Sequence, residues 1–571
     1  MKSLKWFQIL TLLIVVSLVL AACAPQVSQP IATPPAAEEA APTEPPAAEE
    51  AAPTEPPAAV EAATEVPAAV EAAAPTQVVI GLDPDYSTFD PARTYEMNSP
   101  IVLNAVYDSL ILFEGDITNP KPGAADSWEI SPDGTQYTFK LHEGITFTSG
   151  NPLTSKDVKW SFERAKNVKG NPSFLLADIA SIDTPDDYTV VVNLSKGDGA
   201  FLFKLTSQPF AILDSETVKM HGGVADETAS TADTANTWLD YHSEGSGPFI
   251  LESYTPDSEV VLVKNPNYWG KPAMVDKVIL KDMPDSNTQM LTMAKGDIDM
   301  AASLNVDQIK QLESEPDVVI SEFKTLSQMF LMVNQDPAIG GPLSNKDVQN
   351  AIRYALDYKG IHALIGEGTI TTPAMIQVGF VGALPALDEN FTDLDKAKEL
   401  LAAAGYADGF DTELQTITNS TEGIKWVSLA QKVQEDLKQV GINIEIKTTD
   451  STVGYTAYRA GEWNFAINAW GPDYIDSNNQ LAFLPGEYVG NRAKWTVEMN
   501  PTLAELGQKA IVEIDQAKRA ELLEEIQVIM STDSPFIPLA QFPRWIASKT
   551  GLKGTEHTDA YRTDLRRVYW E

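Results

Sequence analysis

One stretch in the C-terminal part of the chain, WNFAINAWGPDYID at 463–476, holds the residues whose types and spacing could do chemistry. With the period of two of a strand, Phe465, Ile467 and Ala469 fall on one face, and Asn464, Asn468 and Trp470 fall on the other or at its edge, which predicts a strand. A Gly-Pro turn then breaks the strand, and Asp473, Tyr474 and Asp476 follow it. A carboxylate and aromatics at the end of an apolar strand can hold a cationic group on the floor of a cleft. A strand followed by a solvated acidic loop gives the same pattern, since lone acids are common in loops.

The chain carries none of the common catalytic or metal-binding patterns. His-Glu-x-x-His, Gly-x-Ser-x-Gly and the Walker phosphate loop do not occur, and the 5 histidines lack metal-ligand spacing. Asp473 and Asp476 could serve a glycosidase, but two acids three residues apart in a loop have no fixed geometry. We therefore expect no enzyme, no metal site and no cofactor.

Length and charge further restrict the class of protein to which the chain can belong. The chain has 571 residues, enough to bury a large core and to form two or more lobes. Its 80 acidic and 41 basic residues give a net charge of −39. Nucleic-acid binding needs a basic footprint, so we expect no nucleic-acid partner. Acidity of this degree keeps an exported protein soluble.

The first residues resemble a bacterial lipoprotein signal. Lys2 and Lys5 precede an apolar run at 9–20 that is too short for an ordinary membrane span. The run ends in Leu-Ala-Ala-Cys, which resembles a lipobox, and Cys23 is the single cysteine of the chain. We expect 1–22 to be a signal peptide and Cys23 to carry the lipid that tethers the protein outside the cytoplasm. An ordinary signal peptide followed by an incidental cysteine is the alternative.

Residues 23–76 are expected to be the lipidated cysteine and a disordered tether. The unit PPAAEEAAPTE occurs at 34–44 and again at 45–55, and then decays. The unit has no large apolar residue, its prolines break helices, and its glutamates repel one another. Such a segment cannot form a core, which also argues against a solenoid repeat.

Residues 124–164 are the most diagnostic part of the chain. Their pattern predicts two strands joined by a Pro-Asp-Gly turn, followed by a helix that begins near Thr154 or Ser155. The run AADSWEISPDGTQYTFKLHEGITFTSGNPLTSKDVKWSFER resembles, nearly word for word, the signature of family 5 extracellular solute-binding proteins. These are the binding subunits of ABC importers for peptides and nickel. His142 stands where the family usually has arginine, and Ser149 where it usually has aspartate.

Further motifs in the family's order extend this resemblance over residues 77–571. It implies an α/β fold, the two-lobed clamshell of periplasmic binding proteins, type II-like and with an extra domain, in a discontinuous three-domain arrangement. The motif order would place domain I at 77–115, 246–325 and 537–571. Domain II would be 116–245 and domain III 326–536. The lobes would close over a ligand by hinge bending.

The resemblance also implies a function and a site. In peptide-binding members, the segment that matches 468–473, here including Ala469, Trp470 and Gly471, runs beside the peptide as an added strand. The aspartate that matches Asp473 holds the peptide's α-ammonium group. The protein would capture oligopeptides outside the cytoplasm and deliver them to the ABC permease subunits, and we expect a monomer.

Other residues complete the expected cleft. A segment that matches about 95–98, with Met97 and Asn98, would pair with the other edge of the peptide. Trp470 and Tyr474 would be aromatics of the cleft wall, although both could equally belong to the core.

Two observations leave the ligand open. The arginine that receives the peptide carboxylate in one branch of the family maps onto Ile467, so Arg459 or Arg492 would have to replace it. The family also includes binders of cello- and manno-oligosaccharides. A sugar would stack on tryptophans, for which Trp463, Trp470 and Trp495 are candidates. An oligosaccharide ligand is therefore the alternative.

We expect Cys23→Ser to release the protein from membranes and to leave ligand binding unchanged, because the single thiol would carry the lipid. Membrane fractionation and mass spectrometry measure this. A variant that stays in the membrane fraction, with the same mass as the wild type after signal cleavage, would contradict the lipid assignment.

Overall fold

The computed structural model describes residues 76–84, 86–421 and 424–571. The predicted signal peptide, the lipid site at Cys23 and nearly all of the predicted tether lie outside these residues. Within them, no helix is both long and apolar enough to cross a membrane.

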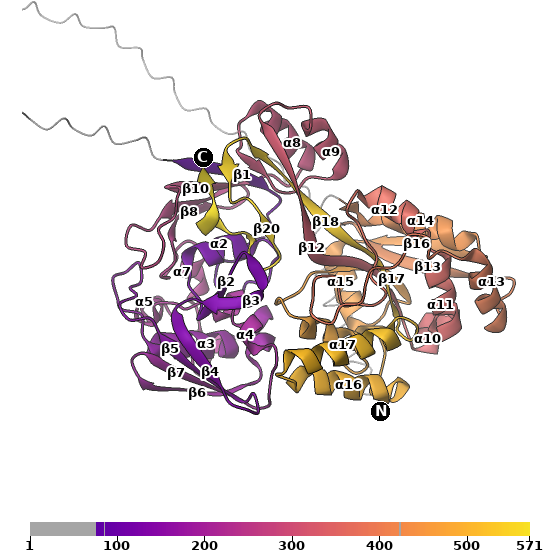
Figure 1. Cartoon of the computed structure of the whole chain (residues 1–571), viewed down its shortest axis with the longest axis horizontal. Coiled ribbons are helices and arrows are strands. Elements are labelled where there is room, and N and C mark those ends of the chain that lie inside the picture. The colour runs from indigo at the N-terminus through magenta and orange to yellow at the C-terminus, as the bar shows by residue number, and fades with distance from the viewer. Residues whose placement is uncertain (1–75, 85, 422–423) are drawn as a thin grey trace, which may run out of the picture. The chain divides into compact units, whose positions relative to one another are not determined.

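A large mixed sheet organises the described chain (Figure 1). Its strand order is β16-β13-β17-β12-β18-β11-β1-β10-β9-β8. The bounds in that order are Ile442–Thr449, Phe410–Ile417, Phe465–Trp470, Val318–Val333, Phe536–Lys549, Met300–Ala301, Gln77–Leu82, Lys277–Asp282, Glu259–Lys264 and Phe249–Thr255. β13 runs parallel to β16, and β1 runs parallel to β10 and β11, whereas β12 is antiparallel to both β17 and β18. Mixed sheets covered by helices are typical of α/β proteins.

One strand pair, β12 with β18, joins the two halves of this sheet (Figure 1). The pairing extends from Val318 opposite Lys549 to Met332 opposite Phe536, and its register shifts twice. Each shift adjoins a proline of β18, Pro543 in one case and Pro538 in the other. Proline lacks the N–H that a ladder needs, so irregular pairing is expected beside it.

The predicted domain boundaries near 325 and 536 fall within β12 and at the start of β18. Both halves of the main sheet therefore share these two strands, and the domain limits stay a prediction.

A second sheet lies in the segment predicted as domain II, with the order β4-β5-β7-β6. The four strands are Ala125–Ile130, Gln136–Leu141, Thr189–Leu194 and Ile179–Asp186. The Pro-Asp-Gly turn joins β4 to β5, and its Gly134 has a φ of +66°, which favours glycine. Helix α3 (Ser155–Val168) follows, with a capping box between Thr154 and Asp157. Both predicted strands and the predicted helix are thus present.

Helices and short strand pairs complete the described chain. The helices other than α3 are α2 (Ser99–Val106), α4 (Phe201–Lys204), α5 (Ser215–Met220), α6 (Ala229–Ala232), α7 (Asn236–Leu239), α8 (Ser286–Lys295), α9 (Val306–Leu312), α10 (Pro337–Gly340), α11 (Lys346–Ala355), α12 (Tyr358–Ile365), α13 (Leu394–Ala403), α14 (Trp426–Lys438), α15 (Ser451–Ala460), α16 (Pro501–Val512) and α17 (Gln516–Met530). The short pairs are β2 (Ile111–Glu114) with β3 (Asp116–Pro122), β14 (Ser420–Thr421) with β15 (Ile424–Lys425), β19 (Leu552–Lys553) with β22 (Tyr569–Trp570), and β20 (His557–Thr558) with β21 (Arg562–Thr563).

A buried charge cluster ties α3 to the segment after β1. Arg164 of α3 is 1% exposed and donates two hydrogen bonds of 2.7 Å to Asp90. It also donates to Asp233 at 2.8 and 2.9 Å, and Arg93 donates to Asp233 at 3.0 Å. Removing one member of such a cluster leaves a buried charge without its partner.

We expect Arg164→Ala to lower the free energy of unfolding by about 3–5 kcal/mol, because Asp90 and Asp233 would stay buried without their main cation. Urea denaturation measures this. The matched control is Lys156→Ala on the same helix, which removes an exposed ion pair with Asp187 of the β6–β7 turn and is expected to cost at most about 1 kcal/mol. Equal effects of the two substitutions would contradict the prediction.

Candidate ligand-binding site

β17 has one edge that is paired along its length and one that is largely free. It pairs with β12 from Phe465 to Trp470, but with β13 only where Ala466 meets Gln415. Among the described residues, no strand pairs with the β13 side of β17 beyond Ala466. Free N–H and C=O groups on such an edge can accept another strand. Gly471 ends β17, and a Cβ at this position would come within 3.3 Å of the Ser327 hydroxyl.

The end of β17 opens onto two cavities, the larger of about 500 Å³ and the smaller of about 290 Å³. We call the two together the cleft, because they share part of their lining. The residues that line both are Met97, Ser327, Asn419, Tyr455, Ala469, Trp470, Gly471 and Arg562. Each volume is of the order that small-molecule sites have, roughly 300–1,000 Å³.

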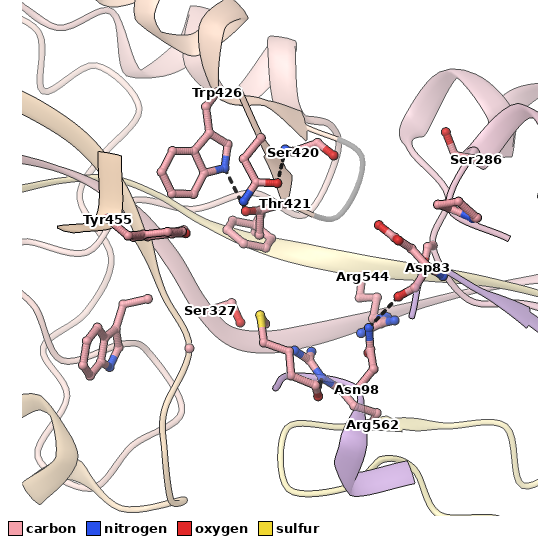
Figure 2. Close-up of a pocket in the computed structure, with 18 residues that line it drawn as sticks. Asp83, Asn98, Ser286, Ser327, Ser420, Thr421, Trp426, Tyr455, Arg544 and Arg562 are labelled. Carbon is pink, nitrogen blue, oxygen red and sulfur yellow. Dashed lines mark hydrogen bonds between the residues drawn. The ribbon is translucent and has the colours of Figure 1, made fainter. Parts of the chain in front are cut away.

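Figure 2 shows the smaller cavity. Trp426 of α14 and Tyr455 of α15 lie on one side of it, and Asp83 and Arg544 lie on the other. The Trp426 indole donates a 2.8 Å hydrogen bond to the Thr421 hydroxyl, which fixes the ring. Trp426 and Arg544 were not among the predicted site residues, because nothing in their local sequence separates them from core positions.

Asp473 lies in the larger cavity at the head of the turn after β17. The Tyr95 hydroxyl donates a hydrogen bond to its Oδ1, while the Asn479 amide and the Tyr488 hydroxyl donate to Oδ2 at 3.0 and 3.3 Å. Removal from water raises the pKa of Asp473, and these hydrogen bonds oppose the rise without cancelling it. An ionised carboxylate accepts about four hydrogen bonds, so this one can accept a further donor.

Asn479 positions both Asp473 and Trp470. Its Oδ1 accepts from the Trp470 indole at 3.1 Å and from the Asp473 backbone N–H at 3.3 Å. Asn479 belongs to the 3₁₀ helix η4 (Ser477–Phe483), which is capped by the Asp476 side chain. The sequence did not predict that Asn479, Tyr95 and Tyr488 are partners of Asp473. The run Asp-Ser-Asn-Asn directly after the turn is, however, a recognisable capping pattern that could have predicted the helix carrying Asn479.

The second acid of the stretch has a structural role. Asp476 is buried and binds Arg519 through contacts of 2.6 and 3.1 Å. Arg519 is itself fully buried. Because Asp476 is held in this ion pair, Asp473 and Asp476 do not form an acid pair facing a common ligand.

The two aromatics predicted for the wall differ in position. Trp470 is half-buried on the wall of both cavities and packs edge-to-face on Phe483, with ring centres 5.1 Å apart. Tyr474 is only 9% exposed and belongs to a core cluster, although it also borders the larger cavity. Lys204 lies 5.3 Å from the centre of its ring. Trp470 is thus the wall aromatic, and Tyr474 is mainly a core residue.

The predicted early segment also reaches the cleft. Met97 is 42% exposed and lines both cavities, and Asn98 lines the smaller one. Arg562 holds this segment by donating from Nε to the Met97 carbonyl at 2.8 Å, and the Asn98 amide donates to the Asp83 carbonyl at 2.8 Å. That the segment also pairs with a ligand stays a prediction.

The tryptophans proposed for sugar stacking do not all reach the cleft. Trp463 and Trp495 are 8% and 3% exposed, lie in the core, and line neither cavity. Their assignment as stacking platforms is therefore wrong, and of the three only Trp470 offers a face to a ligand. Ile467, which stands where one branch of the family has its carboxylate-binding arginine, is fully buried.

Comparison with known proteins identifies the family. Residues 119–491 match the model described as bacterial extracellular solute-binding proteins, family 5 middle. The chain belongs to this family. Family 5 proteins are binding proteins for transport and not enzymes, so the expectations of the family and of no enzyme are confirmed.

Curated relatives of this family 5 protein carry names that point to different ligands. It is 28% identical over 490 residues to the probable D,D-dipeptide-binding periplasmic protein of Escherichia coli (strain K12), an alignment that covers 85% of this chain and 92% of the relative. It is also 28% identical to heme-binding protein A of Haemophilus influenzae, over 79% of this chain and 84% of the relative.

A solved relative shares the fold. It is the ABC transporter-associated periplasmic binding protein of Helicobacter pylori in complex with the peptide STSA. The two chains are 27% identical, with a TM-score of 0.73 over 87% of this chain and 99% of the relative. The predicted fold class, the two-lobed α/β clamshell, is confirmed.

We expect the Asp473 carboxyl to titrate above the ordinary aspartate pKa of about 3.9, because burial penalises its charged form. Tyr95→Phe should raise this pKa further, since it removes a hydrogen bond to the ionised form. Carboxyl-carbon NMR over a pH series measures both. Tyr406→Phe, which alters a tyrosine outside both cavities, is the control, and an Asp473 pKa at or below the ordinary value would contradict the prediction.

Proposed function

We propose that this family 5 protein is an extracytoplasmic lipoprotein that captures short peptides in the cleft and delivers them to an ABC permease. The observation that carries this is the position of Asp473, a preorganised carboxylate at the end of the free edge of β17. A peptide brings an ammonium group for Asp473 and a backbone for that edge. The dipeptide and peptide names among the relatives support the same class of ligand.

The α-ammonium group would bind where three kinds of stabilisation meet. It can donate to the remaining lone pair of Asp473 and to the hydroxyl oxygens of Tyr95 and Tyr488. The Trp470 and Tyr488 rings, 6.1 Å apart, offer π faces to the same cation. Enclosure of these groups strengthens the ion pair, because a cleft closed to water has a lower effective dielectric constant.

The peptide backbone would run beside residues 468–473 as an added strand. Main-chain pairing contributes affinity without selecting side chains, so ligands that differ in sequence can share one binding mode. An oligosaccharide gains less from this site, because Trp463 and Trp495 are buried and a sugar has no ammonium group for Asp473.

Membrane attachment would come from a lipid on Cys23, the single cysteine, which directly follows Leu-Ala-Ala. One protomer contains the whole cleft, which fits the expected monomer.

We expect Asp473→Asn to weaken the binding of a tripeptide with a free N-terminus by about 2–5 kcal/mol, because the ammonium group would lose its counter-charge in the closed cleft. This corresponds to a loss of roughly 30- to several-thousand-fold at about 1.4 kcal/mol per decade. N-acetylated tripeptides should bind the wild type weakly and lose little more in the variant. Isothermal titration calorimetry measures all four combinations.

The matched control is Asp408→Asn, which removes an exposed charge outside both cavities and should leave affinity unchanged. Equal affinity of the wild type for free and acetylated peptides would end the ammonium assignment. Binding of a β-linked oligosaccharide pool without any peptide binding would favour the sugar alternative.

A further inference from the structure

Three arginines line the larger cavity: Arg562, which also lines the smaller one and binds the Met97 carbonyl, and Arg459 and Arg492, which line the larger one alone. The guanidinium carbon of Arg492 lies 5.1 Å from the ring centre of Tyr458 and 5.5 Å from that of Tyr488. Arg459 of α15 lies 5.8 Å from the ring centre of Tyr455, four residues earlier on the same helix. Stacking on aromatic rings holds a guanidinium in place while its N–H edge stays available for a planar anion.

Neither Arg459 nor Arg492 forms a salt bridge within the described part of the chain, although the charge of Arg492 is close enough to Asp473 to oppose the rise in the pKa of that carboxyl. Arg492 is half-buried, whereas Arg459 is exposed at the cavity rim. Salt bridges are plentiful elsewhere in this acidic chain, so two arginines without one in the same cavity need an explanation.

The acids of the same cavity are held by other groups. Glu96 accepts from the Thr94 hydroxyl at 2.8 Å and from the backbone N–H of Tyr95 at 2.9 Å. Asp559 accepts from the backbone N–H of Leu326 at 3.0 Å. Asp473 accepts the three hydrogen bonds described above. The protein's own carboxylates therefore leave the arginine edges open to an anion from outside.

The position of the arginines indicates which part of a ligand they meet. Arg492 stacks on Tyr488, the ring whose hydroxyl binds Asp473, so the anion and ammonium positions lie one side chain apart. Asp473, Arg459 and Arg492 all line the larger cavity and not the smaller one. A peptide that starts at Asp473 and follows β17 would continue toward the smaller cavity, past Ala469 and Trp470. The arginines would then flank its N-terminal end.

We propose that the ligand carries a carboxylate that binds Arg492 and Arg459, so that the protein selects acidic peptides with Asp or Glu at the first or second position. This inference rests on the proposed function, because it takes Asp473 as the ammonium site. The C-terminal carboxylate of a very short peptide is the other source of the same group. Arg492 contributes more than Arg459, since it is half-buried and held between two rings.

The test is calorimetric titration of the full-length protein in detergent with the tripeptides Glu-Ala-Ala, Gln-Ala-Ala and Ala-Ala-Ala, and with Ala-Ala-Ala amide. The titrations are repeated with Arg492→Gln, Arg459→Gln and, as the matched control, Lys494→Gln. Lys494 binds the Ala460 carbonyl at 3.0 Å close to both arginines but lines neither cavity, so its substitution removes the same charge outside the site.

We expect Glu-Ala-Ala to bind the wild type about 10- to 100-fold more tightly than Gln-Ala-Ala, the range for one hydrogen-bonded charge pair. Arg492→Gln should remove most of this preference, Arg459→Gln a smaller part, and Lys494→Gln none. If instead only amidation weakens binding, and Arg492→Gln abolishes that effect, the bound carboxylate is the C-terminal one.

Two results overturn the inference. One is peptide binding by the wild type that is equal for all four ligands. The other is an acid preference that Arg492→Gln changes no more than Lys494→Gln does. If the wild type binds none of the peptides, the proposed peptide function fails as well, so failure of the function and failure of the carboxylate site give different results.

Discussion

The pairing of β12 with β18 is the interaction on which the rest of this structure depends. It is the one ladder among the described strands that joins the half of the sheet around β1 to the half around β17. It is also irregular, since prolines interrupt it in two places. The cleft opens beside this ladder, and Ser327 from β12 and Arg544 from β18 line it. The geometry of the site therefore depends on two strands that belong wholly to neither half.

Beside that ladder, the residues of the site are held in place by neighbours that are close to them in the sequence. The turn after β17 exposes Asp473, the Asn479 amide holds both Asp473 and Trp470, and the buried pair of Asp476 with Arg519 fixes the 3₁₀ helix that carries Asn479. Each acid of this stretch has a distinct role. Asp476 is bound within the protein, whereas Asp473 keeps acceptor capacity. Selective binding generally requires that the side chain contacting the ligand is itself held in place by further contacts within the protein.

The elements set by nearby residues could be predicted from the sequence. Strand alternation predicts β17, and a Pro-Asp-Gly turn and a capping box predict the β4–β5 hairpin and α3, because these signals act over a few residues. The order of family motifs predicted the clamshell. The partners of Asp473 could not be predicted, since Tyr95 lies 378 residues earlier in the chain. Local pattern also cannot tell that Trp470 faces a cavity while Trp463, on the same stretch, is packed in the core.

The place of β18 in the chain has a consequence for the timing of folding. β12 ends at Val333 and β18 begins at Phe536, so the ladder that unites the sheet can form only after the long intervening segment has been synthesised. Until then, the free long edge of β12 is exposed to pairing with other chains. A nascent chain of this topology therefore gains from being kept unfolded until β18 has emerged, and a chain cut before Phe536 would lack the ladder beside which the cleft opens.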